Sequence, residues 1–164
     1  MSPSRYSLVL LITSAWSLGA IWLLRPLVDR ARPTVPSHQT VLTMAEAVLR
    51  NADRFYGAQI GYSQATPSTV LAWRVIFESP SADSTFKAIV ASATLSGKLY
   101  ALAGLYITDS VAYRAAVHGL RAGGGFVPTF IHCDVSDWSL EALLADMDRG
   151  LWTDEFIEGR LMHH

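Results

Sequence analysis

The chain has 164 residues, of which 51% are hydrophobic and only 16% are charged, and its formal net charge is −1. This length allows one domain plus a short additional segment, and the balanced charge argues against a polyanionic partner such as nucleic acid. A single cysteine, Cys133, excludes an internal disulfide and leaves the redox compartment open.

Residues 6–24 form the most apolar stretch, with 19 consecutive uncharged residues between Arg5 and Arg25. A helix of that length reaches roughly 28 Å, close to the hydrocarbon thickness of a bilayer. The alternative is a cleaved secretory signal, for which residues 13–15 are a tolerable cleavage site, but the apolar run continues well beyond them. We therefore predict a single-pass transmembrane anchor over residues 1–25.

Small and hydroxyl side chains on this stretch predict contact with another membrane helix, because they let helices approach closely. The alternative is that such residues are simply common in membrane spans. The stretch contains no histidine, so it offers no imidazole ligand for a haem or chlorophyll. The residues expected to pack in the membrane are Thr13, Ala15, Trp16, Ser17, Gly19 and Ala20.

The two flanks of this stretch favour opposite orientations of the domain relative to the membrane. Arg25, Arg30 and Arg32 favour a cytoplasmic domain by the positive-inside rule, whereas the short N-terminal tail resembles the start of an export signal. We predict an inner-membrane protein with an extracytoplasmic domain. Residues 26–39, with three prolines, are expected to form a linker between the two.

Apolar residues recur with helical spacing through most of residues 40–164, which predicts a mainly α domain. Connections of one to three residues favour antiparallel helical hairpins, in the manner of a short α-solenoid. Residues 55–63 and 126–133 have the composition of strands and are expected to pair as a minor two-stranded element. The expected helices are 44–54 with a cap at Thr43, 67–78, 80–93, one from Thr94, one from Thr108 to Arg121, one from Ser136 to Arg149, and a short one from Thr153.

The run TLSGKLYALAGLY at residues 94–106 resembles a segment of bacterial envelope domains of unknown function. The resemblance covers about residues 55–150. It implies a helical fold and no particular activity.

Two glycine-containing motifs invite a phosphate-binding interpretation. Ser96-Gly97-Lys98 lacks the spacing of a phosphate-binding loop, and a helix precedes it where that loop needs a strand. Residues 123–125 are three glycines without the strand-to-helix context of a dinucleotide site. We interpret the first as the start of a helix and the second as the end of one.

His132, Cys133 and Asp134 are the most reactive-looking neighbours in the chain. Cysteine and histidine can form a nucleophilic pair, and all three residue types bind metals. On a strand, however, adjacent side chains point to opposite faces, so only His132 and Asp134 would share one. A structural cysteine and a hydrogen-bonded histidine remain the simpler interpretation, and no metal or cofactor is predicted.

The acidic residues gather at the C-terminal end, where residues 134–164 hold eight acidic and two basic residues. They lack the spacing of an EF-hand. A solvated helical face and a docking surface for a basic partner are the two interpretations.

These observations favour a non-catalytic, membrane-anchored accessory or assembly subunit of a larger membrane complex, of respiratory or photosynthetic type. Its expected partners are integral-membrane subunits and the lipid bilayer, with no nucleic acid. The first alternative is a free-standing envelope module that binds a peptide or small ligand in an apolar pocket between its helices. The second is an enzyme that uses His132 and Asp134, which needs both side chains in one concave site.

Overall fold

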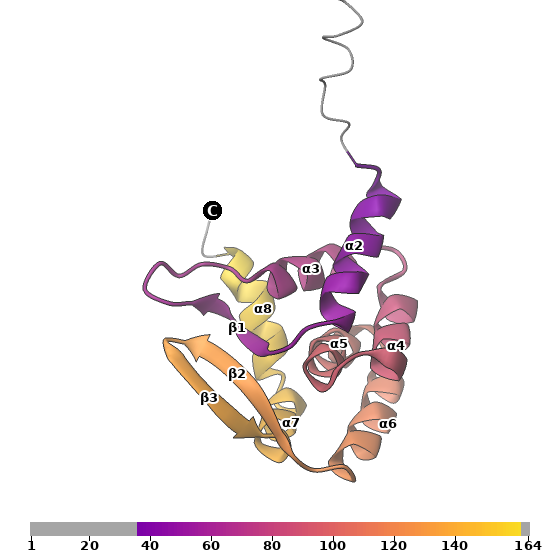
Figure 1. The fold of residues 1–164 in the computed structure, drawn as a ribbon. Coiled ribbons are helices and arrows are strands. Elements are labelled where there is room, and N and C mark those ends of the chain that lie inside the picture. Colours follow the sequence, from indigo (N-terminus) through magenta and orange to yellow (C-terminus); the bar gives the residue numbers. More distant parts are fainter. Residues whose placement is uncertain (1–35, 162–164) are drawn as a thin grey trace, which may run out of the picture. The chain divides into compact units, whose positions relative to one another are not determined.

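Seven helices and three strands make up residues 36–161, the part of the chain that the computed structural model describes (Figure 1). The helices are α2 (His38–Arg50), α3 (Ser68–Phe77), α4 (Ala82–Ser92), α5 (Leu95–Thr108), α6 (Ser110–Arg121), α7 (Leu140–Asp148) and α8 (Leu151–Leu161). The strands are β1 (Phe55–Ile60), β2 (Phe126–His132) and β3 (Asp134–Ser139). The mainly helical character expected from the apolar spacing is confirmed.

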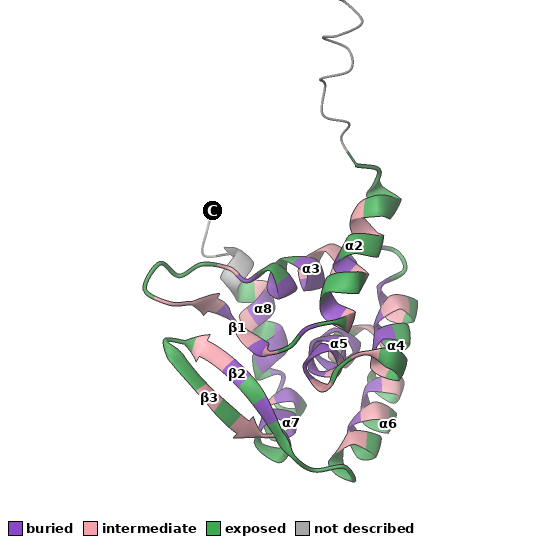
Figure 2. Ribbon diagram, in the orientation of Figure 1, coloured by how far each residue is buried: buried purple, intermediate pink, exposed green. Residues whose placement is uncertain are grey.

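Helix α5 is the centre of the domain, and every residue from Leu99 to Leu105 is buried (Figure 2). It contacts all six other described helices as well as β1 and β2. Small residues permit this crowding, since a Cβ at Gly104 would overlap the ring of Phe86 and one at Gly97 would overlap the carbonyl oxygen of Leu49. The uncharged run from Leu99 to Leu105 fits a helix segment with no solvent face, whereas Ile107 near the end of α5 is exposed.

The three strands form one mixed sheet in the order β1-β2-β3. β1 runs parallel to β2, with Phe55 beside Thr129, and β2 runs antiparallel to β3, with Pro128 beside Asp137. Helices α5, α7 and α8 lie on one side of this sheet (Figure 1). The expected pairing of residues 55–63 with residues 126–133 is therefore confirmed, but it is only part of the sheet.

Side-chain caps precede four of the described helices, although not always the expected residues. Thr94 accepts the N–H of Gly97 at the start of α5, as expected, and its own hydroxyl donates to the carbonyl oxygen of Ala52, just after α2. No side-chain cap starts α3 or α4, where the sequence favours Thr66 and Ser79, and three further expected caps are wrong. α2 begins at Ser37 instead of Thr43, α6 at Asp109 instead of Thr108, and α7 at Ser139 instead of Ser136.

The expected fold class needs correction in its details. An α-solenoid stacks helix pairs so that each contacts only its neighbours, whereas here α5 is enclosed by all the other described helices. The two-stranded element is a three-stranded sheet, because residues 134–139 continue from β2 as an antiparallel strand instead of beginning a helix.

The third correction concerns the membrane. None of the described helices is both long enough and apolar enough to cross a bilayer. The stretch at residues 6–24, with Thr13, Ala15, Trp16, Ser17, Gly19 and Ala20, lies outside the described residues.

Candidate functional site

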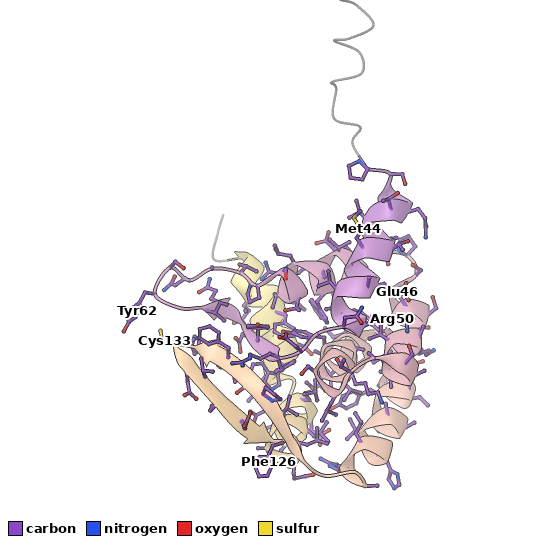
Figure 3. All side chains as sticks on the ribbon, in the orientation of Figure 1. Met44, Glu46, Arg50, Tyr62, Phe126 and Cys133 are labelled. Atoms are coloured by element: carbon purple, nitrogen blue, oxygen red, sulfur yellow. The ribbon has the colours of Figure 1, made fainter. Side chains whose placement is uncertain are left out.

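His132 and Cys133 form the two-residue turn that joins β2 to β3. His132 adopts a left-handed backbone with φ of 53°, and its carbonyl oxygen accepts the N–H of Gly61 at 2.6 Å. A shallow recess of about 230 Å³ lies between this turn and the loop after β1, which carries the fully exposed Tyr62 (Figure 3).

Asp134 does not pair with His132. Its Oδ2 accepts the hydroxyl of Ser136 at 2.7 Å, and His132, Cys133 and Asp134 are all exposed. Within residues 36–161 no three His, Cys, Asp or Glu side chains lie where they could share a metal ion. The turn therefore does not place His132 and Asp134 together in one concave site, which the enzyme hypothesis requires.

The glycine motifs have structural roles. Gly97 is packed against the end of α2, so the N-terminus of α5 is closed by protein instead of open to a phosphate. Gly124 and Gly125 have positive φ angles after α6, and the carbonyl of Gly125 accepts the N–H of Leu140 at 2.9 Å. Both interpretations as helix ends are confirmed.

Most acidic side chains of α7 and α8 are engaged within the domain, which leaves little of the uniform acidic face that a basic partner would need. Contacts of Asp148 and Glu141 join α7 to α6, and the contact of Glu155 joins α8 to β1. Burial and the bond to Asp148 raise the pKa of Tyr113. The contacts join Asp148 with Tyr113 and Arg121, Glu141 with Arg121, Asp146 with Arg149, and Glu155 with the backbone of Ala58.

A cavity of about 360 Å³ opens between the end of α2, strand β1 and the start of α3. Its wall is as polar as it is apolar, with Asn51, Asp53, Ser68 and Thr69 among its residues. Behind it, the Thr69 hydroxyl donates to the buried Tyr100 Oη at 2.9 Å. The volume of this cavity matches the pocket expected for a small ligand. Its mixed polar and apolar wall does not match the expected apolar lining.

The clearest surface feature is the side of the sheet that the helices leave uncovered. We call it the outer sheet face. Phe126 is 71% exposed and Val135 is 59% exposed, and the rings of Tyr56 and Phe130 meet there at 6.2 Å. Within the described residues this face is mainly apolar, and Asp137 on β3 is the acidic residue that borders it. Its members are Tyr56, Phe126, Pro128, Phe130, Val135 and Asp137.

The strand register explains how this face arises. Phe126, Pro128 and Phe130 alternate with Val127 and Thr129, which are buried against the helices. Because both sets are largely apolar, the sequence alone does not tell which one faces the core. The alternation at residues 126–130 is nevertheless the signal that could have indicated an exposed apolar face.

Searches of protein-family models, curated proteins and solved structures find no match to this chain. The resemblance of residues 94–106 to bacterial envelope domains therefore stays a prediction.

Proposed function

We propose that the protein is a non-catalytic accessory or assembly subunit of a larger membrane complex, with residues 6–24 as its membrane-associated part. Two observations support this proposal. The uncharged stretch is long enough to lie within a bilayer, and the domain that follows carries an apolar surface that its own described residues do not cover.

The outer sheet face is the observation that carries the proposal. Contiguous apolar patches rimmed by polar residues are typical of protein-binding surfaces, and aromatic side chains are their usual anchors. Phe126 projects from the body of the domain at its lower edge in Figure 3, and Val135 lies on the neighbouring strand. Covering one such side chain stabilises a complex by roughly 1.5–3 kcal/mol before the cost of association.

The test is to purify the full chain from its native membranes in mild detergent. The protein should elute from gel filtration together with integral-membrane partners. Elution as a free monomer from such membranes would overturn the proposal. Washing the membranes at alkaline pH tests the membrane part separately, because a protein held within the bilayer stays in the pellet whereas a peripheral protein is released.

Two variants then test whether the outer sheet face makes the contact. Phe126→Asp should lower the yield of the complex by at least about fivefold, the loss that about 1 kcal/mol brings. Val111→Asp is the matched control, because Val111 is 68% exposed on α6, away from the sheet. Equal yields from both variants would assign the contact to another surface.

A second candidate function is the capture of a small ligand by a free-standing envelope module, and the cavity beside β1 favours it. It predicts that native mass spectrometry of the full chain from its own membranes detects a bound small molecule. Ser68→Trp at the mouth of the cavity should displace this molecule, whereas Ala115→Trp on the exposed side of α6 should not. A protein without added mass would dismiss this candidate.

A further inference from the structure

The two edges of the sheet differ in what closes them. At the β1 edge, Tyr100 Oη accepts the N–H of Tyr56 at 2.7 Å and Glu155 accepts the N–H of Ala58 at 2.8 Å. At the β3 edge no hydrogen bond from another described residue replaces a neighbouring strand. One edge is therefore closed to further strands, and the other is open within the described part of the chain.

Two hydrogen bonds show which residues of β3 face the open edge. Leu140 N–H donates to Gly125 O at 2.9 Å, and the Thr129 hydroxyl donates to Ser136 O at 2.8 Å. Because backbone groups alternate in direction along an antiparallel strand, Ser136 faces β2, and the residues on either side of it face away. The outward N–H and C=O groups thus belong to Val135 and Asp137.

The side chains of these two residues lie on the outer sheet face, where Val135 is paired with Phe130 and Asp137 with Pro128. Val135 extends the apolar surface toward the edge. Asp137 is exposed, and its carboxylate has no hydrogen-bond or ion-pair partner among the described residues. A strand added beside β3 would place one side chain about 5 Å from Asp137 and another, two positions away, beside Val135.

We propose that β3 binds an extended segment of a partner subunit by strand addition, and that this segment carries Lys or Arg opposite Asp137 and an apolar residue opposite Val135. The inference rests on the proposed role as an accessory subunit. A second copy of this chain fits less well, because joining two antiparallel β3 edges through the outward backbone groups of Val135 and Asp137 would place the two Asp137 carboxylates opposite or diagonal to each other on one face.

The probe is a short peptide with blocked ends, called the lysine peptide, in which every second residue is threonine and the residues between are valine or lysine. A second peptide, the glutamate peptide, has glutamate in place of each lysine. Both peptides are labelled and titrated into the full chain in mild detergent, with fluorescence polarisation as the readout. The lysine peptide should bind, the glutamate peptide should bind at least about fivefold more weakly, and hydrogen exchange at Val135 and Asp137 should slow when the lysine peptide is bound.

Three variants locate the contact. Val135→Pro removes one outward N–H at an edge position that tolerates proline, and it should weaken binding about tenfold. Val135→Thr keeps the N–H and should stay within about threefold of the unchanged chain. Asp137→Lys keeps the backbone intact and should reverse the preference, so that the glutamate peptide binds better. Asp154→Lys makes the same charge change on α8 and is the control, so it should not reverse the preference between the two peptides.

The outcomes separate this inference from the proposed function. Absence of peptide binding, or equal binding by the Val135→Pro chain, would overturn strand addition even where the protein still elutes with membrane partners. Equal affinity for both peptides would overturn the role of Asp137. A protein that binds the lysine peptide but elutes alone from native membranes would retain the edge site and lose the accessory-subunit role.

Discussion

The carboxylate of Glu155 accepts the backbone N–H of Ala58 across 2.8 Å, so helix α8 closes the outer edge of β1. Ala58 is only 3% exposed, so water cannot readily replace this acceptor. Glu155→Ala should lower the free energy of unfolding by about 1–3 kcal/mol, because a buried donor loses its partner. Glu158→Ala, exposed on the same helix, should change it by less than about 0.5 kcal/mol. Urea denaturation of both variants measures the difference.

Tyr100 supplies the other closure of β1 from the middle of α5. Its hydroxyl oxygen accepts the N–H of Tyr56 at 2.7 Å and the hydroxyl of Thr69 at 2.9 Å, and burial raises its pKa. Tyr100→Phe should destabilise the domain by about 2–3 kcal/mol, since two donors lose their acceptor. Adding Thr69→Val to Tyr100→Phe should recover part of this loss, because it removes one of the stranded donors. Additive costs in the double-mutant cycle would contradict this account.

The helical part of the fold was largely predictable because apolar spacing acts locally, whereas Thr94 is the exception among expected caps that were mostly wrong. The central place of α5 was not, since it depends on Gly104 giving room to Phe86 and on Gly97 lying against Leu49, residues far apart in the chain. Periodicity shows which side of a helix is apolar. It does not show how many neighbours an all-apolar helix will have.

Strand β3 was missed for a different reason. Its turn carries no Asn-Gly or Gly at the position that needs a left-handed backbone, and His132 takes that place instead. Without this signal, the sequence favours Ser136 as a helix cap, although Ser139 is the residue that accepts the N–H of Ala142. The part of the outer sheet face that β3 supplies, Val135 and Asp137, was unpredictable for the same reason, whereas the alternation at residues 126–130 was readable in the sequence.

His132 should accordingly be a position where glycine improves the fold. A backbone φ of 53° costs free energy for any residue with a Cβ, whereas glycine adopts it without that cost. His132→Gly should raise the free energy of unfolding by up to about 1 kcal/mol, although a more flexible unfolded chain offsets part of the gain. His132→Ala keeps the Cβ and should give no gain. A matching increase in both variants would show that loss of the imidazole, and not backbone strain, is responsible.

Two helical glycines should respond in opposite ways to the same substitution. Gly104→Ala places a methyl group against the Phe86 ring in the packed core and should cost about 1–3 kcal/mol. Gly119→Ala on α6 meets open space and should stabilise the helix by up to about 1 kcal/mol. Thermal unfolding of the two variants measures both signs. Combining Gly104→Ala with Phe86→Leu should relieve part of the clash, and failure to do so would place the strain elsewhere.

Asp109 links acid stability to one ion pair. It caps α6 by accepting the N–H groups of Val111 and Ala112, and its Oδ2 lies 2.7 Å from Lys87 Nζ. The hydrogen bond with Lys87, followed by the bond from Ala112, lowers the pKa of Asp109 from 3.8 to about 2. Because the folded-state pKa is the lower one, the ionised carboxylate stabilises the domain above pH 3.8, and this contribution is lost as the pH falls toward 2.

Asp109→Asn separates this charge from the cap, since asparagine still accepts the N–H groups of α6. We expect lower stability than the unchanged chain at pH 5 and a smaller decline on acidification through the window set by the two pKa values of Asp109. Asp154→Asn, exposed on α8, should leave the pH profile unchanged. Because the pair with Lys87 lies near the surface, high salt should shrink the difference between Asp109→Asn and the unchanged chain. Denaturation midpoints measured across this range, with and without salt, test both statements, and parallel profiles for the two chains would remove Asp109 as the acid-sensitive group.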